Sequence, residues 1–150
     1  MRLVIQRVQE AELKTDGAVY SSIGPGLLVL LGIEDEDAED DLNFLVQKLA
    51  GMRIFSDEEG KMNLDVKQIN GEIMIVSQFT LHASTKKGNR PSFIKAARPE
   101  KASPLYEKFI LETEKALGKT CKQGKFGADM KIKLINDGPV TILMDSKNRE

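Results

Sequence analysis

The sequence predicts a layered domain of the α/β or α+β class, and two observations lead to this prediction. Short apolar runs recur along the chain, and two longer segments repeat their apolar residues with the period of an amphipathic helix. Strands mixed with two helices are typical of these classes. A chain of 150 residues, 41% hydrophobic and 30% charged, also has the size and composition of one globular domain, predicted over residues 1–150.

The first half of the chain is predicted to place four strands before the first helix. The strands are expected at residues 2–9, 11–14, 18–23 and 27–31. The last of them follows a Gly-Pro-Gly turn and is apolar on both faces, as in a strand buried on both sides. An acidic run at 34–41 then leads into the helix. Its apolar residues recur at i, i+3, i+4 and i+7: Leu42, Leu45, Val46 and Leu49.

The second half is predicted to contain the second helix and the remaining strands. The strands are expected at residues 53–55, 72–81, 130–135 and 140–144, and the helix at 101–117. A basic loop at 86–90 separates the core strand from this helix. A turn at 136–139 joins the last two strands.

Charge and residue counts exclude several classes of function. The net charge of −1 argues against a polycation that holds nucleic acid by charge alone, although residues 86–101 carry six bases and one acid. Cys121 is the single cysteine and His82 the single histidine, so neither an intrachain disulfide nor a zinc site of Cys and His ligands is expected. No metal or other cofactor is therefore predicted.

The N-terminal run contains charges and is interpreted as a strand, and the longest apolar run, at 26–33, is too short to span a bilayer. A cytoplasmic protein with no membrane partner is expected.

The run VSQFTL at residues 76–81 is the first candidate site. It sets the hydroxyls of Ser77 and Thr80 and the amide of Gln78 into an apolar strand, where polar groups are costly unless they are paired or used. Backbone N–H groups at the end of such a strand could stabilise an oxyanion, with Phe79 anchoring the strand in the core. The alternative is a buried strand whose hydroxyls bond to neighbouring backbone. A Thr80–His82 pair on one strand face is also possible, although a partly exposed histidine at the strand end is the simpler interpretation.

The run NDGPVT at residues 136–141 is the second candidate site. A cis bond between Gly138 and Pro139 would turn two carbonyls the same way, forming a rigid acceptor pair for an ammonium group. Such a pair would leave no space on one side of the adjacent carbon. The alternative, which the frequency of cis bonds favours, is an ordinary trans turn that starts an edge strand. Motifs for phosphate loops, dinucleotide folds, metalloproteases and the nucleophile elbow are absent.

These runs resemble the D-aminoacyl-tRNA deacylase family, also called D-tyrosyl-tRNA deacylase. The resemblance extends nearly from end to end, in order and at matching spacing, and no motif position departs from it. The matching runs are RLVIQRV at 2–8, GLLVLLGI at 26–33, RIF at 53–55, GKMNL at 60–64, VSQFTL at 76–81, KGNRPSF at 87–93, GKFGADM at 124–130 and NDGPVT at 136–141.

The resemblance implies a fold, an activity and an assembly. The implied fold is an α/β domain with a curved, barrel-like mixed sheet and two main helices, assembled as a homodimer. The implied activity is hydrolysis of the ester that joins a D-amino acid, or glycine, to the 3′-terminal adenosine of tRNA. Gly138 and Pro139 would then form a cis motif that enters the partner subunit's pocket and rejects L-amino acids.

The resemblance also assigns roles to individual residues. Arg7 matches the position that braces the Gly-Pro motif, and Phe126 and Met130 match pocket positions near the terminal adenosine. Ser77, Gln78, Phe79 and Thr80 match the substrate-binding strand, and Thr80 matches a proposed nucleophile. These four are the candidate catalytic residues.

An activated ester with a neighbouring ribose hydroxyl needs positioning and an oxyanion site more than a strong base. We therefore favour the backbone amides of Phe79 and Thr80 as donors over Thr80 as a nucleophile. The basic loop could contact tRNA phosphates, and a solvated loop is an equal alternative. Two other functions stay open at this point. One is a non-catalytic RNA-binding module, and the other is a small-ester hydrolase that uses Thr80 and His82.

Overall fold

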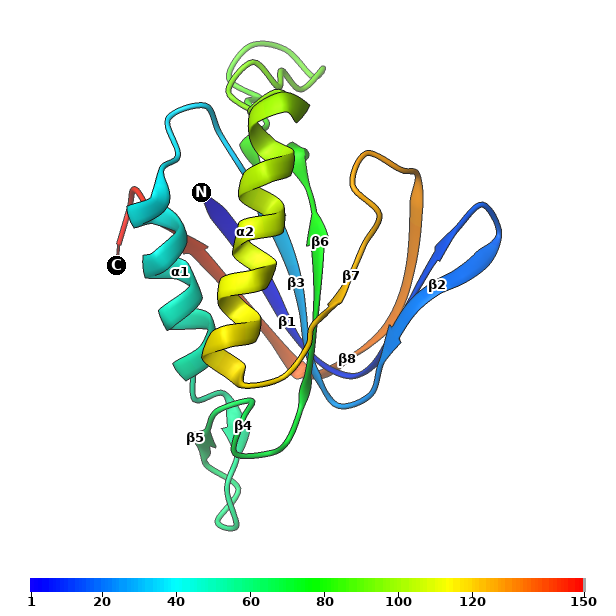
Figure 1. The fold of residues 1–150 in the computed structure, drawn as a ribbon, viewed down its shortest axis with the longest axis vertical. Coiled ribbons are helices and arrows are strands. Elements are labelled where there is room, and N and C mark those ends of the chain that lie inside the picture. The colour runs from blue at the N-terminus through cyan, green and yellow to red at the C-terminus, as the bar shows by residue number, and fades with distance from the viewer. Residues whose placement is uncertain (150) are drawn as a thin grey trace.

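A computed structural model of the chain describes residues 1–149, so Glu150, the last residue of the predicted domain, lies outside the described residues. The chain begins with three strands and ends with a long strand, and between these lie two helices separated by further strands (Figure 1). In order they are β1 (Arg2–Thr15), β2 (Ala18–Ile23), β3 (Gly26–Gly32), α1 (Glu39–Gly51), β4 (Phe55–Ser56), β5 (Met62–Leu64), β6 (Glu72–Ser77), η1 (Phe79–His82), α2 (Pro99–Leu117), β7 (Lys122–Gln123) and β8 (Met130–Asp145).

The main sheet is mixed and strongly curved, as expected. Its strands run in the order β2-β1-β3-β6-β7, and β8 lies off this path. β8 pairs with β1 along the edge opposite to β3 and β2, which pair with successive parts of β1. β1 pairs antiparallel with β2, β3 and β8, whereas β3 and β6, and β6 and β7, run parallel. The C-terminal half of β1 and the N-terminal half of β8 bend away from the helices together with β2 (Figure 1). This bend gives the sheet its nearly closed, barrel-like shape.

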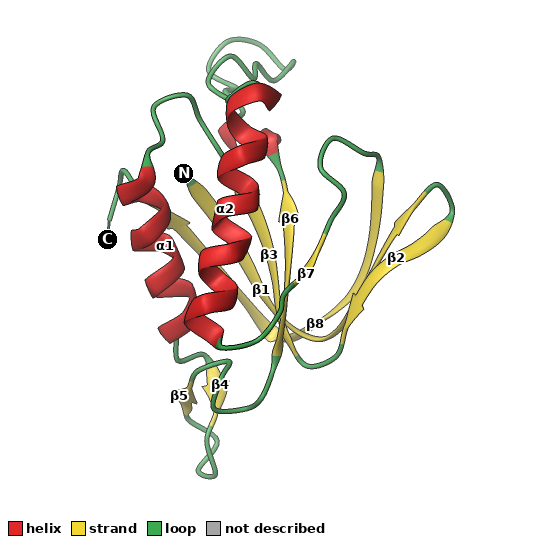
Figure 2. Cartoon of the chain, in the orientation of Figure 1, coloured by secondary structure: helices red, strands yellow, loops and turns green. Residues whose placement is uncertain are grey.

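Both helices cover the same face of the sheet and enclose the principal core against it (Figure 2). The predicted apolar face of α1 is confirmed, because Leu42, Leu45 and Leu49 are fully buried. They pack with Leu3 and Ile5 of β1, which alternate with half-buried residues as a strand with one covered face requires. A second, smaller apolar cluster fills the curved end of the sheet. It contains Val8, Ala11, Leu13, Ile23, Leu28, Met74 and Val76.

Several predicted boundaries were wrong. β1 is one strand of 14 residues rather than two pieces, because β3 and then β2 pair with it in succession. The predicted strand at 53–55 begins only at Phe55, and β5 and β7, which have two or three residues each, were missed. The predicted helix at 101–117 begins at Pro99, because proline suits the first helical position. Among the described residues, no helix is long and apolar enough to cross a membrane.

The prediction of a core strand through residue 81 was also wrong. β6 ends at Ser77, and a short 3₁₀ helix, η1, begins at Phe79. The N–H of Leu81 donates to the carbonyl of Gln78 at 3.3 Å, and the N–H of Ala83 donates to the carbonyl of Thr80 at 3.0 Å. The chain therefore turns sharply at the point where the predicted substrate strand was expected to continue.

Candidate active site

The end of β6 opens into a cavity of about 590 Å³. Its lining comes from the carboxyl ends of β3 and β6, the first turn of α2, and the segment between β7 and β8. Five predicted site residues are among those that line it: Ser77, Gln78, Phe79, Phe126 and Met130. Sequence positions more than 45 residues apart are thus brought to one cavity, as the resemblance implies.

Thr80 is not among the lining residues, but it is linked to them. The Gln78 side-chain amide donates to the Thr80 hydroxyl at 2.5 Å, and Thr80 is exposed. Within residues 1–149, no hydrogen bond is found for the N–H groups of Phe79 and Thr80. The first N–H groups of a helix have no partner inside it, so the turn at η1 leaves two donors available at this end of β6.

Two expectations for this segment were wrong. The ring of Phe79 does not anchor the core, because 56% of the residue is exposed. His82 is not a partly exposed histidine at a strand end but is buried, with an exposed fraction of 2%. Its Nδ1 atom lies 3.7 Å from the Glu34 carboxylate, and its Nε2 atom has no hydrogen-bond partner among the described residues. With Thr80 exposed and His82 buried, the strand-face pair required for the small-ester hydrolase does not form.

Tyr106 of α2 ties together the two segments that form the walls of the cavity. Its buried hydroxyl donates to the carbonyl of Ile75 in β6 at 2.8 Å and lies 3.2 Å from the carbonyl of Gly124. Its ring contacts Phe126, with 5.6 Å between ring centroids. Burial raises the pKa of the Tyr106 phenol, so this hydroxyl stays protonated and remains a donor. The sequence contained no signal for this role, since a tyrosine on an amphipathic helix is an ordinary core residue.

The Gly-Pro motif lies within β8, not in a turn between two strands. Gln6 pairs with Thr141 and Val8 with Asn136, so the single residue Arg7 faces the four residues 137–140 of β8. The extra residues form a bulge in which the Gly138–Pro139 bond is cis and Gly138 has a φ of +125°. The prediction of two strands joined by a turn was therefore wrong, because both halves run in the same direction along β1.

Arg7 holds this bulge from the opposite strand. Its Nε atom donates to the carbonyl of Asp137 at 3.2 Å and lies 3.1 Å from the Asp137 carboxylate. Its Nη1 atom donates to the carbonyl of Ile54 at 2.6 Å, and the residue is buried. A guanidinium with paired donors is well suited to fix a strand bulge in one conformation. Arg7, Gly138 and Pro139 lie together, but none of them lines the cavity of the same chain.

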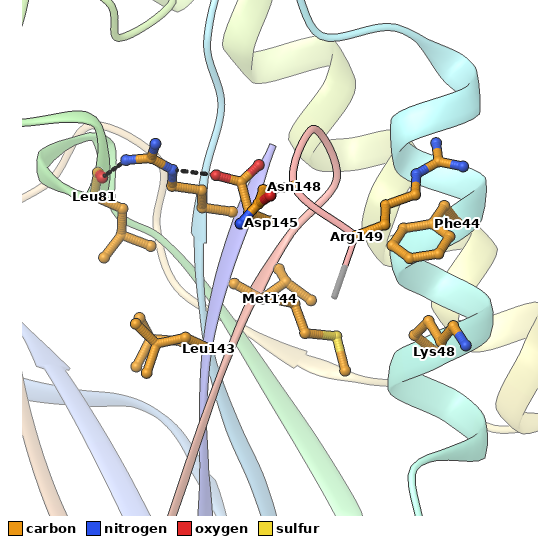
Figure 3. A pocket seen from close by; sticks show the side chains of 11 residues that line it. Phe44, Lys48, Leu81, Leu143, Met144, Asp145, Asn148 and Arg149 are labelled. Carbon is orange, nitrogen blue, oxygen red and sulfur yellow. Dashed lines mark hydrogen bonds and ion pairs between the residues drawn. The ribbon is translucent and has the colours of Figure 1, made fainter.

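A second cavity, of about 460 Å³, contains none of the predicted site residues (Figure 3). It lies between α1, β1 and the end of β8, and the guanidinium of Arg149 covers the ring of Phe44 there at 4.2 Å. Arg2 connects this region to η1, since it donates to the Leu81 carbonyl at 2.9 Å and to Asp145 at 2.8 Å (Figure 3). Among the described residues, no group of three or more His, Cys, Asp or Glu side chains could hold a metal ion.

Comparison with known proteins agrees with the sequence resemblance. The family model described as "D-Tyr-tRNA(Tyr) deacylase" matches residues 4–145. Proteins named D-aminoacyl-tRNA deacylase from Akkermansia muciniphila and Bacteroides thetaiotaomicron are 59% and 56% identical, each over the full length of both chains. The solved structure "c-Myc DNA Unwinding Element Binding Protein" is 41% identical, with a TM-score of 0.91 over 97% of this chain and 98% of that one.

A further solved structure shows that the fold is shared beyond close sequence similarity. It is titled "Structural Analysis of a probable eukaryotic D-amino acid tRNA deacylase" and has a TM-score of 0.81 at 20% identity. The alignment covers 95% of this chain and 97% of that one. With the family model matching almost the whole sequence and full-length relatives above 50% identity, the chain belongs to the D-Tyr-tRNA(Tyr) deacylase family.

Proposed function

We propose that the chain hydrolyses D-aminoacyl-tRNA by positioning the ester at the end of β6, without a protein nucleophile or general base. Hydrolysis of D-aminoacyl-tRNA is the activity of its family. The observation that carries the proposal is the pair of N–H groups at Phe79 and Thr80, which donate to no acceptor among the described residues. They could donate to the oxyanion that develops as water attacks the ester.

A matched pair of variants at Phe79 tests the role of the backbone. Phe79→Pro removes the side chain and one N–H, whereas Phe79→Ala removes only the side chain. Proline is compatible with this position because Gln78, with φ −143° and ψ 83°, lies outside the α region that a following proline disfavours. The proline variant should lose about 10²- to 10³-fold more in kcat than the alanine variant. Equal losses would show that this N–H does not contribute.

Thr80→Ala tests whether the hydroxyl is a nucleophile. The hydroxyl accepts from Gln78, which favours a positioning role. Deacylation should therefore keep a substantial part of its rate, and complete loss with normal tRNA binding would favour the nucleophile instead. The complementary test changes the substrate: D-tyrosyl-tRNA with a 2′-deoxy terminal adenosine, charged at the 3′ oxygen, should react much more slowly if the ribose hydroxyl assists the water.

Phe126 and Met130 are proposed to contact the terminal adenosine, since both line the cavity beside the predicted catalytic residues. Glycyl-tRNA is a proposed second substrate, because glycine has no side chain for a chiral filter to exclude. Chiral rejection is assigned to Gly138 and Pro139, held by Arg7. In this arrangement an L-amino acid is refused because its side chain would collide with the motif.

The motif is proposed to act on the pocket of a second subunit in a homodimer. The separation of Arg7, Gly138 and Pro139 from the cavity lining of their own chain supports this arrangement. Leu143, five residues beyond Gly138 in β8, is 75% exposed, and an exposed apolar side chain on this strand is consistent with a partner surface. A cytoplasmic location, where translation takes place, is part of the same proposal.

Subunit mixing tests the shared site. Gly138→Ala should accept L-tyrosyl-tRNA, because the shifted motif no longer excludes it. Adding excess Phe79→Pro chain, which is catalytically impaired but carries an intact motif, should place that motif in the working pocket. Activity toward L-tyrosyl-tRNA should then fall while activity toward the D form remains. If both activities per Gly138→Ala chain stay constant, the motif does not act across subunits.

A further inference from the structure

Two aromatic side chains at the cavity are more exposed than their size leads one to expect. Phe79 is 56% exposed and Phe93 is 38% exposed, and both line the cavity. Their rings form an edge-to-face pair, with 5.1 Å between centroids and an interplanar angle of 74°. Paired aromatic rings that remain open at the edge of a binding cavity are typical of a stacking surface.

The backbone holds this pair in place from two directions. Phe79 is the first residue of η1, whereas Phe93 follows Ser92, which forms two hydrogen bonds with Ser84 at 2.8 and 2.9 Å. The N–H of Ala96 donates to the Phe93 carbonyl at 3.0 Å, which closes a turn directly after the ring. A ligand that stacks there would therefore bind a preformed surface and would not have to order a loose loop.

The segment beside the pair carries positive charge that the described chain does not neutralise. Lys86, Lys87 and Arg90 lie between the two bridging serines and are exposed, and this segment extends beyond the N-terminal end of α2 (Figure 1). None of the three forms an ion pair within residues 1–149. By contrast, Lys61 and Lys108 elsewhere on the surface are paired with carboxylates at 2.6 Å. Unpaired cations next to exposed rings match the alternation of phosphates and bases in single-stranded nucleic acid.

We propose that the Phe79–Phe93 pair stacks on the base of the nucleotide that precedes the terminal adenosine of bound tRNA, while residues 86–90 meet its phosphates. This inference rests on the proposed function, which places the ester and the terminal adenosine in the cavity. The chain of the tRNA must leave through the cavity rim, so the next base meets the two rings. The pair thereby selects an aminoacyl-RNA end over an aminoacyl-adenosine alone.

Two substrates separate this role from catalysis. Phe93→Leu should lower kcat/KM for D-tyrosyl-tRNA about 5- to 150-fold more than for the 3′ ester D-tyrosyl-adenosine, the range expected for loss of one base–aromatic stack. Phe93→Tyr should restore the preference for tRNA. Ile94→Ala is the matched control, because this neighbour is 90% exposed and not aromatic, and it should leave the preference unchanged. Equal losses on both substrates, or no loss, would overturn the proposal.

An abasic nucleotide before the terminal adenosine tests the same contact from the side of the RNA. With the unmodified protein, the abasic substrate should lower kcat/KM about as much as Phe93→Leu does. With the Phe93→Leu variant, the abasic substrate should lower kcat/KM little further, because both changes remove the same interaction. Independent, additive losses would overturn the proposal. So would dissociation of a dimer by Phe93→Leu in sedimentation, which would make the pair a subunit contact. Failure of the proposed function itself would look different, because the unmodified protein would then hydrolyse neither substrate.

Discussion

Gly138 is the position at which the geometry of the proposed chiral filter can be perturbed most directly. Its φ of +125° lies in a region that side chains disfavour, and an added Cβ would lie 2.7 Å from Cγ2 and 3.0 Å from the nitrogen of Val140. The same Cβ would lie 3.1 Å from the Nη2 atom of Arg7. The conformation costs about 1–3 kcal/mol for alanine, and overpacking against Val140 adds about 1–3 kcal/mol. Gly138→Ala should therefore destabilise the fold by about 2–6 kcal/mol.

The assay is thermal unfolding together with deacylation of D- and L-tyrosyl-tRNA. For a protein of this size the cost corresponds to a fall in Tm of about 4–24 °C. Gly60→Ala is the matched control, since Gly60 has a φ of +77° but no atom within 4 Å of the added Cβ. It should show only the conformational cost and keep its stereospecificity, whereas Gly138→Ala should also lose discrimination between the two substrates. Equal Tm values for the two variants, with the D-to-L ratio of the unmodified protein in both, would refute this reasoning.

Three further predictions concern the surroundings of the site and the fold. Tyr106→Phe removes the donor to the Ile75 and Gly124 carbonyls and should lower Tm by about 2–8 °C while raising KM; an unchanged Tm would contradict its structural role. Burial, and then the charge of Glu114, raise the pKa of Cys121 to about 12, so alkylation by iodoacetamide at pH 8 should be about 10³-fold slower in the folded protein than in urea. Burial opposes ionisation of Asp41, but hydrogen bonds from Lys147 and the Ala38 N–H outweigh it and lower its pKa to about 2. Asp41→Asn should therefore be destabilising at neutral pH, and its difference from the unmodified protein should close as the pH falls from about 4 to 2. A constant difference across that range would contradict the assignment.

The elements that sequence reasoning predicted well are those whose pattern is local. The apolar periodicity of α1 predicted its buried face, and the continuous apolar run of β3 indicated a strand buried on both faces. The structure confirms this, because Leu27, Val29 and Leu31 lie in the principal core and Leu28 lies in the second cluster. η1 could not be predicted, because VSQFTL has no glycine or proline to mark the end of β6. The burial of His82 follows from that turn and was equally hidden.

The candidate site shows the same division between local and long-range information. Ser77, Gln78 and Phe79 were singled out because polar groups interrupt an apolar run, and the structure places them at the cavity. The bulge opposite Arg7 could not be derived from either strand alone, because it depends on how β1 and β8 pair across more than 120 residues. The role inferred for Phe93 was missed because its exposure depends on the Ser84–Ser92 bridge. Phe126 and Met130 were predicted only through the family resemblance.

The most direct test of the central claim is the release of tyrosine from matched D-tyrosyl- and L-tyrosyl-tRNA, measured with and without the protein. The account predicts fast release of the D form and no release of the L form above the uncatalysed rate. Equal release of both would contradict chiral selection and indicate a general esterase. Release of neither, with tRNA still bound, would contradict catalysis altogether and leave an RNA-binding module.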